Sequence, residues 1–262
     1  MKKSLLLFAL VLLLAGCAST GNQAAPAGGT PAGSPSEEPG LTAGAPEKMT
    51  CRIVDGAEEG ELVLAGAGDV YTLDTEGLAV DGPLADGAMV EVGFDGMILE
   101  TYPAKFGHVT GVTVLEELAD DRCGLYLQVL SDLWEDTALN TGLEELGVDL
   151  SGLTDLTGSE KSALAWVFGN AHGLMPITGT LEEIWEAGYL TPMTGPAEGY
   201  EDSVALYRWE NGCLFSLSGS AEEGFEAQKW ASGLGAYFFT DCTARQNADG
   251  TWTYEVGAEA IA

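Results

Sequence analysis

Basic residues are scarce in this sequence. Ten Lys and Arg stand against 41 Asp and Glu, and the formal net charge is −31. Proteins that bind nucleic acid need clustered Lys and Arg to displace counterions from phosphates, so no nucleic-acid partner is expected. Anionic lipid headgroups are disfavoured for the same reason. The acidity is typical of an exported protein kept soluble by self-repulsion, or of one that binds a cation or a basic partner.

The motifs of the common enzyme classes are absent. The sequence contains no GxSxG, GxxxxGK[ST], HExxH or CxxC, so the usual nucleophile, phosphate-loop, zinc-peptidase and thioredoxin-type chemistries lose their main support. Its two histidines lack flanking catalytic signatures. We expect His108, in a strand-like run, to be structural, and His172, after a helix, to lie at the surface or cap that helix. No catalytic residue and no cofactor is therefore predicted.

One loop has a partial calcium-binding pattern. In RQNADGTWTYEV, Asn247 and Asp249 fall in EF-hand phase, but Arg245 occupies the first ligand position and Val256 the twelfth, where a bidentate Glu is required. We therefore predict a turn between two strands and no metal site.

Long hydrophobic runs are also missing, because the longest is ten residues, Leu5 to Leu14. A membrane-spanning helix needs about 20 apolar residues. A short run after Lys2 and Lys3 and before a small-residue site predicts a secretory signal peptide over residues 1–16. Removing it leaves eight basic residues against 41 acidic ones, a net charge of −33.

The residues Leu14-Ala15-Gly16-Cys17 resemble the lipobox of bacterial lipoproteins. The resemblance implies that the Cys17 thiol receives a diacylglyceryl group and that Cys17 becomes the mature N-terminus. Residues 17–48 are rich in Ala, Gly, Pro, Ser and Thr and cannot bury a core, which predicts a lipid-anchored flexible linker. The expected location is extracytoplasmic, at the outer face of the cell membrane.

Residues 49–118 are expected to form a small all-β domain. Short strand signals separated by Gly-containing turns recur through this segment. In MVEVGFDGMILET, apolar residues alternate on both sides of Asp95-Gly96, which predicts a two-residue hairpin. Together the strands predict a small closed or partly open β-barrel. Arg52 and Lys105 are its only bases, so oligonucleotide binding is not expected.

Residues 119–262 are expected to form an α+β domain, with helices first and an antiparallel sheet after them. Apolar residues at helical spacing begin in DDRCGLYLQVLSDLWEDT. Three capping boxes follow and predict three further helix starts, Thr141 with Glu144, Thr157 with Glu160 and Thr180 with Glu183. The matching C-terminal caps are expected at Gly147, Gly169 and Gly188. Trp166 and Trp185 lie among apolar residues on these helices and are expected in the core rather than on a sugar-stacking platform.

After Tyr200 the hydrophobic period changes to two. SVALYRWENGCLFSLSG predicts a hairpin around Asn211-Gly212, and RQNADG is expected to join two longer strands. In the last of these, Trp252, Tyr254 and Val256 share the face predicted to be buried.

Both domains resemble parts of known lipoproteins. The first, with Tyr102-Pro103-Ala104 and Phe106-Gly107 after its hairpin, resembles OB-like modules of exported lipoproteins of Gram-positive bacteria. The second, from FEAQKWASGLGAYFFTDCTA through GTWTYEVGAEAI, resembles a C-terminal module of uncharacterised surface lipoproteins of clostridial-type gut bacteria. These resemblances imply a setting at the cell surface and no activity.

Cys17 apart, the sequence has four cysteines, Cys51, Cys123, Cys213 and Cys242. An even number in an exported protein permits two disulfides. Since Cys213 and Cys242 lie on strand-like runs of one domain, their bridge is the preferred pairing, and buried free thiols are the alternative.

The sequence favours a non-enzymatic envelope lipoprotein that serves as a ligand-binding, interaction or display module. Its expected partners are the membrane, through the N-terminal lipid, and a cell-wall component or another envelope protein. Two alternatives stay open: an envelope hydrolase that acts on glycan or peptide through carboxylates, and a divalent-cation-dependent adhesin.

Overall fold

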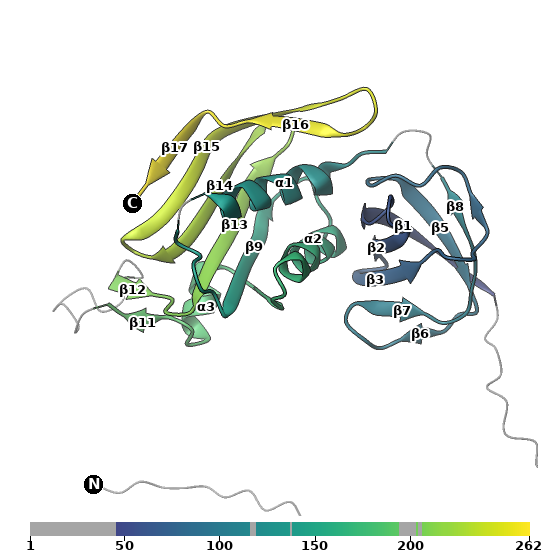
Figure 1. Cartoon of the computed structure of the whole chain (residues 1–262), viewed down its shortest axis with the longest axis horizontal. Coiled ribbons are helices and arrows are strands. Elements are labelled where there is room, and N and C mark those ends of the chain that lie inside the picture. The colour runs from purple at the N-terminus through teal and green to yellow at the C-terminus, as the bar shows by residue number, and fades with distance from the viewer. Residues whose placement is uncertain (1–45, 116–118, 137, 194–202, 204–205) are drawn as a thin grey trace, which may run out of the picture. The chain divides into compact units, whose positions relative to one another are not determined.

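The computed structural model describes residues 46–115, 119–136, 138–193, 203 and 206–262 (Figure 1). The signal segment, Cys17 and nearly all of the 17–48 linker lie outside these residues, as does the point between 118 and 119 where the domain boundary was predicted. Residues 42–262 group as one compact unit. Within the described part of the chain, no helix has the length and hydrophobicity needed to cross a membrane.

Eight strands form the first sheet, in the order β4-β8-β5-β1-β2-β3-β7-β6. Most neighbours are antiparallel, but β3 and β7 are parallel, as are β4 and β8. Alternate residues of β5 are buried, as expected for a strand with one face on a core. The strands are β1 (Glu47–Asp55), β2 (Glu61–Gly66), β3 (Asp69–Asp74), β4 (Val80–Asp81), β5 (Met89–Phe94), β6 (Ile98–Leu99), β7 (Ala104–Phe106) and β8 (Val109–Val114).

This sheet corrects the predicted OB-like barrel. The β5 strand pairs with β1 and β8, whereas β6 pairs with β7, so the strands around Asp95-Gly96 do not form the predicted hairpin. Gly96 does have the positive φ expected of a turn residue, 80°. No pairing among the described strands joins β4 to β6, so the sheet is open and mixed. Alternating hydrophobicity shows that a strand has one buried face, but it does not specify which strand pairs with it.

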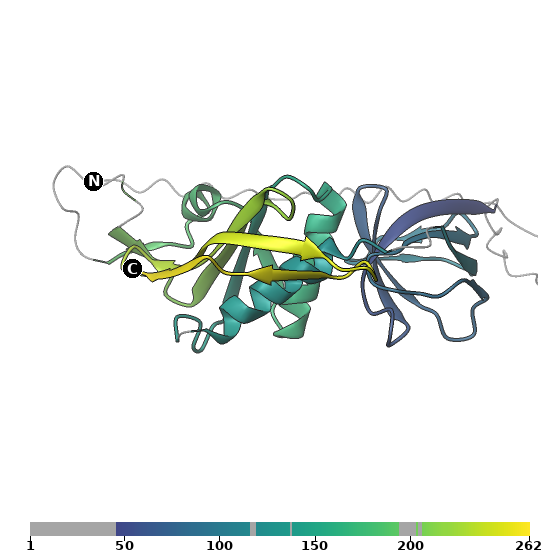
Figure 2. The same cartoon turned by 90° about the horizontal axis from the view of Figure 1, so that it is seen from above.

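The second sheet has nine strands. Its main path is β10-β9-β13-β14-β12-β11, and β15 continues it by pairing with β14, β16 and β17. Figures 1 and 2 show the yellow strands β16 and β17 beside β15. The strands are β9 (Glu145–Leu153), β10 (Pro176–Thr178), β11 (Thr191–Pro192), β12 (Tyr207–Arg208), β13 (Gly212–Ser220), β14 (Gly224–Ser232), β15 (Gly235–Gln246), β16 (Trp252–Glu255) and β17 (Ala258–Ile261).

Three helices are present in the described residues: α1 (Arg122–Glu135), α2 (Gly158–Ala171) and α3 (Leu181–Glu186). The N-cap of α1 is Asp121, whose carboxylate accepts a hydrogen bond from the Gly124 amide at 2.9 Å. The capping boxes predicted for α2 and α3 are both present. Of the predicted C-terminal glycines, Gly188 follows α3 with φ 86°, whereas Gly169 lies inside α2.

The helices-first α+β prediction is wrong. The described residues are 47% strand and 17% helix, and β9 lies between α1 and α2 in the chain. The Thr141–Glu144 capping box is not formed, because Glu144 leads into β9, and Gly147 lies inside that strand. The β9 strand pairs in parallel with both β10 and β13, so the sheet is mixed rather than antiparallel. The Asn211-Gly212 hairpin is also absent, because β12 pairs with β11 and β14 and not with β13.

The two faces of the second sheet carry different layers. On one face α1 and α2 cover a core that includes Cys213 and Phe215 of β13. On the opposite face, Leu214 packs in a cluster with Ile184 of α3 and with Trp209 and Trp230. Successive residues of a strand point to opposite faces, so α2 and α3 lie on opposite sides of this sheet.

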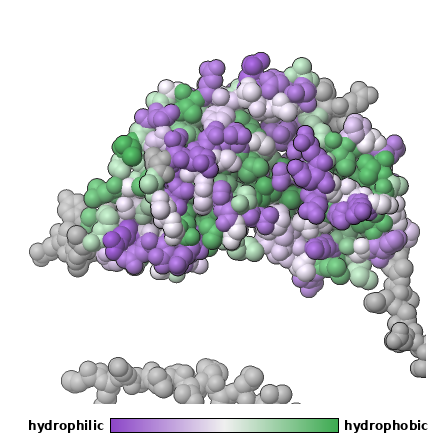
Figure 3. Space-filling view, viewed as in Figure 1, coloured by the Kyte–Doolittle hydropathy of each residue, from purple (hydrophilic) through white to green (hydrophobic). Residues whose placement is uncertain are grey.

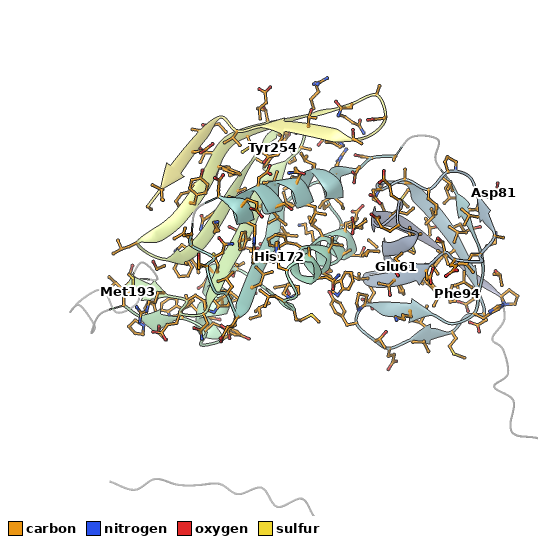
Figure 4. All side chains as sticks on the ribbon, viewed as in Figure 1. Glu61, Asp81, Phe94, His172, Met193 and Tyr254 are labelled. Atoms are coloured by element: carbon orange, nitrogen blue, oxygen red, sulfur yellow. The ribbon has the colours of Figure 1, made fainter. Side chains whose placement is uncertain are left out.

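The last strands confirm one further sequence prediction. The residues RQNADG join β15 to β16, with Gln246 opposite Trp252. Trp252, Tyr254 and Val256 pack against the α1 side of the core. The hydroxyl group of Tyr254, which is labelled in Figure 4, donates a hydrogen bond to Asp132 of α1.

Candidate functional site

A groove of about 830 Å³ lies between the first sheet and α2. Its walls come from β2, β3, the residues that join β7 to β8, and the outer side of α2. The volume falls within the roughly 300–1,000 Å³ usual for ligand sites.

A glycine turn holds one acidic wall in place. Gly56 has φ 90°, and a Cβ atom there would lie 2.1 Å from the Glu61 carbonyl oxygen, so no other residue fits. The Gly60 amide donates to the Gly56 carbonyl at 3.0 Å, and the Thr75 hydroxyl donates to the Gly60 carbonyl at 2.9 Å. These bonds fix the turn that presents Glu59 and Glu61 to the groove. Glu61 is labelled in Figure 4.

One carboxylate attaches the opposite wall to the sheet. Glu160 Oε2 accepts hydrogen bonds from the Thr157 amide and hydroxyl, both at 2.7 Å, and so caps α2. Its Oε1 atom lies 2.7 Å from Arg52 Nε on β1. The Arg52 guanidinium also donates to the Gly87 carbonyl at 2.7 Å. The start of α2 is thereby bound to the first sheet, and its later residue Trp166 lines the groove.

Apolar packing reinforces this attachment. A cluster of buried side chains joins β1, β2 and β3 to α1 and α2. Its members are Val54, Val63, Ala65, Val70, Cys123, Ala163 and Val167. Because protein interiors are close-packed and resist deformation, this cluster holds the two walls at a fixed separation.

The groove is strongly acidic. Four carboxylates line it, those of Asp55, Glu59, Glu61 and Asp74, against the single ammonium group of Lys105. None of these five groups has an ion-pair partner within 4 Å among the described residues. The site therefore offers negative charge that the described protein does not neutralise.

Asp55 is partly buried, whereas the other three acidic residues of the groove are exposed. Burial raises the pKa of its carboxyl group above the usual value, and the nearby carboxylates of Asp86 and Glu59 raise that pKa further. A cation bound nearby would favour the charged carboxylate and lower this pKa.

The wall from α2 is partly aromatic. Trp166 is half-buried, and it lines the groove together with Asn170. Phe106 of β7 lines it from the sheet. An indole ring provides a flat apolar surface that attracts cations and stacks with flat ligand groups. The groove therefore combines charge and an aromatic surface.

The two histidines lie in different places in the structure. His108 lines the groove, and its carbonyl accepts a hydrogen bond from the Asp95 amide at 3.0 Å. His172 caps the C-terminus of α2, as predicted. Its ring stacks on Trp134 with a centroid distance of 3.6 Å and an angle of 11°. Burial lowers the pKa of His172.

The predicted Cys213–Cys242 disulfide is not formed in this structure, and both residues are buried free thiols. Cys242 lies opposite Phe225 near the start of β14, whereas Cys213 precedes Leu214, which lies opposite Trp230 near the end of β14. The two cysteines are thus on strands separated by β14 and at opposite ends of it. A disulfide requires Cα atoms within about 7 Å, which this register does not allow.

The loop before β16 forms the predicted turn. Asp249 Oδ1 accepts hydrogen bonds from the Thr251 amide at 3.2 Å and the Thr251 hydroxyl at 2.7 Å. Gly250 has the positive φ, 91°. Within the described ranges, no group of three or more His, Cys, Asp or Glu side chains is arranged to hold a metal ion.

Sequence reasoning did not identify the groove residues. Glu59 and Glu61 are two among many acids, and no local pattern separates them from solvated surface charge. Trp166 was assigned to the core on its helical spacing, and the structure leaves it half-buried at the groove. Figure 3 shows hydrophilic residues spread among hydrophobic ones over the visible face.

Comparisons of the chain with protein-family models, with curated proteins and with solved structures find no match.

Proposed function

We propose that this protein is a lipid-anchored envelope protein that binds an elongated, positively charged ligand in the groove between the first sheet and α2. The observation that carries the proposal is the groove itself, in which four carboxylates face one ammonium group. A ligand of the required chemistry is a Lys- or Arg-containing peptide segment, such as one presented by another envelope protein. The role is binding, with Cys17 as the point of lipid attachment.

The dimensions and the lining favour a peptide over a small ion. A groove of about 830 Å³ is much larger than a hydrated metal ion requires. The half-buried Trp166 ring offers a surface for the aliphatic stems of Lys and Arg side chains, which prefer apolar contact beneath their charged heads. The carboxylates of Glu59, Glu61 and Asp74, all on exposed residues, then pair with the charged heads.

Binding of a fluorescein-labelled tetra-arginine peptide, followed by fluorescence anisotropy, tests this proposal. The triple variant Glu59→Gln, Glu61→Gln and Asp74→Asn removes three exposed groove charges. We expect it to raise the Kd at least tenfold, because charged groups at a site dominate the attraction of a charged ligand. The wild-type affinity should also fall as salt screens these charges.

A matched control separates the groove from the overall charge. The triple variant Glu47→Gln, Asp81→Asn and Glu255→Gln removes the same number of exposed carboxylates from positions that do not line the groove. This control should bind the peptide with nearly the wild-type Kd. Equal weakening in both triple variants would show that the peptide responds only to net charge, and the groove proposal would then be rejected.

Lipid attachment has its own test. Radiolabelled palmitate supplied to cells that express the protein should be incorporated into the wild type and not into Cys17→Ala. Incorporation that persists in Cys17→Ala would overturn the assignment of the anchor, whatever the result for the groove.

A second candidate function is an envelope hydrolase that cleaves glycan through carboxylates, because the groove brings several carboxylates together. Burial shifts the pKa of the Asp55 carboxyl group upward, the direction that a proton donor requires. If the protein is such a hydrolase, it should release reducing ends from cell-wall glycan, and Asp55→Asn should abolish the release. Absence of turnover by the wild type would leave the binding function as the explanation of the groove.

A further inference from the structure

The parallel strands of the second sheet form a second, smaller site through their connections. The β9 strand continues into α2, which packs on the face that carries Val148 and Leu150. The adjacent strand β10 continues into α3, which packs on the opposite face with Leu214. Two neighbouring parallel strands therefore send their next helices to opposite faces of the sheet. In parallel sheets, such a switch point leaves a crevice at the carboxyl ends of the strands, where ligands bind.

The register shows why this crevice is open. Thr178, the last residue of β10, lies opposite Val148, and β9 continues for five residues beyond it to Leu153. Beyond Thr178 the chain turns at Gly179 into the N-cap of α3, Thr180. The edge of β9 past this point therefore has no β10 residue beside it.

A cavity of about 210 Å³ occupies this position. It is lined by the carboxyl half of β9, by Thr178 and Gly179 after it, and by the first turns of α2 and α3. Water occupies about 30 Å³ per molecule in the liquid, so the cavity corresponds to roughly seven waters. It has room for a small molecule and not for a peptide strand.

Charges of opposite sign lie on the two sides of this crevice. Lys161 comes from α2, and its ammonium group donates to the Ser151 carbonyl at 3.2 Å. Asp149 alternates with Val148 and Leu150 and therefore lies on the α3 side, where Glu183 also lines the cavity. No ion pair within 4 Å joins Lys161 to either carboxylate in the part of the chain that is described.

Hydrogen bonds position each charged group, and each group keeps free hydrogen-bonding capacity. Asp149 Oδ1 accepts from the Ser151 amide at 2.9 Å and from the Ser151 hydroxyl at 2.6 Å. Glu183 Oε2 accepts from the Thr180 amide at 2.8 Å. A carboxylate has about four acceptor positions and an ammonium group three donors, so both signs of charge have capacity left for a ligand.

We propose that this crevice binds a small zwitterion of the size of a free α-amino acid. The ligand carboxylate pairs with Lys161 on the α2 side, and the ligand ammonium pairs with Asp149 and Glu183 on the α3 side. Ser162 and Thr178 also line the cavity. This site is separate from the acidic groove and does not depend on the function proposed for it.

Backbone amide shifts in ¹⁵N NMR spectra test the proposal with defined probes. L-Alanine should shift the amides of Ser151 and Gly179 in a saturable way, whereas ethylamine and propionate, which each lack one of its charges, should bind at least tenfold more weakly. Lys161→Met should weaken L-alanine binding at least tenfold, and Lys161→Arg should restore part of it. The matched control, Lys48→Met, removes an exposed Lys far along the chain from the crevice and should not change the affinity.

The thermal midpoint of each variant establishes that it is folded. Lys161 is only partly buried, so its replacement by Met should not prevent folding. Saturable binding of propionate as tight as that of L-alanine would show a simple anion site and would overturn the zwitterion assignment. No shift with L-alanine at 50 times the expected millimolar Kd, in a folded wild-type protein, would reject the crevice as a site. Loss of peptide binding at the groove would leave this result unaffected.

Discussion

Arg52 on β1 and Glu160 on α2 form an ion pair with an Nε–Oε1 distance of 2.7 Å, and the other oxygen of the same carboxylate caps α2. The Glu160 side chain therefore both caps α2 and links this helix to the first sheet. The side chains are only 24% and 11% exposed, so solvent screens the pair weakly.

Glu160→Gln should lower the free energy of unfolding by about 1–3 kcal/mol. Gln can still complete the capping box, so the loss comes from the Arg52 charge that remains poorly solvated without its partner. Urea unfolding measures the effect. In the control Glu91→Gln, the lost partner is Lys48, whose side chain is 72% exposed, and the cost should stay below about 1 kcal/mol. Equal costs in the two variants would contradict the structural role given to Glu160.

Asp121 should make stability depend on pH. Burial raises the pKa of its carboxyl group from 3.8 to about 6, with Asp86 and Asp55 adding repulsion, although the Gly124 amide opposes the rise. The folded state therefore binds the proton more tightly than the unfolded state. The resulting stabilisation is complete below pH 3.8 and is lost as the pH rises through 6, by up to about 3 kcal/mol.

The free energy of unfolding measured in urea at pH 5 and pH 7 tests this dependence. Asn is as good an N-cap as Asp, so Asp121→Asn keeps the helix start. In this variant the free energy of unfolding should decrease less between pH 5 and pH 7 than in the wild type. Asp81→Asn, at an exposed position, should keep the wild-type decrease. A wild-type slope in Asp121→Asn would assign the pH dependence to other groups.

Lys229→Met should destabilise the protein by about 2–4 kcal/mol. Lys229 is fully buried, and its ammonium group donates to the Asp136 carbonyl and to Asn140 Oδ1 at 2.9 Å. Met fills similar space but leaves these buried acceptors without a donor. Urea unfolding compared with Lys48→Met, an exposed Lys, measures the difference. A neutral effect of Lys229→Met would mean that water replaces the ammonium group.

The cysteines should be inert until the protein unfolds. The four described thiols are buried, and burial raises the pKa of Cys51 and Cys213 to about 12 and that of Cys242 to about 11. An aromatic disulfide reagent at pH 7.5 should therefore react with none of them in the native protein. In denaturant it should titrate four thiols, and a fifth would indicate a Cys17 without lipid. Two thiols would point to a disulfide that this structure does not contain.

Protonation of His172 should quench the fluorescence of Trp134. The rings are stacked at 3.6 Å, and the lowered pKa of His172 places the step below the ordinary histidine value of about 6.5. A fluorescence titration from pH 4 to pH 8 should show this step in the wild type and lose it in His172→Gln. A step that survives in His172→Gln would assign it to another pair.

The helix starts at Thr157 and Thr180 were predictable because a capping box uses atoms within four residues of each other. The same pattern at Thr141 was misleading. The alternating residues Leu146, Val148 and Leu150 that follow it fit a strand, and pairing with β10 and β13 decides the outcome. Local propensity is a weak preference that tertiary pairing overrides.

Each candidate site combines residues that are far apart in the sequence. The groove brings Glu59 and Trp166 together, and the crevice brings Asp149 and Glu183 together. No spacing rule connects such pairs, because their proximity follows from strand order and from which face each helix covers.

The sequence by itself determined the acidic character of this protein, the positions of α2 and α3, and the turn before β16. Each of these depends on composition or on contacts between close neighbours. Only the tertiary structure decided which strands pair, that the four described cysteines stay unpaired and which carboxylates share a cavity. These outcomes are set by the burial of apolar faces across the whole chain, and that burial is a non-local quantity.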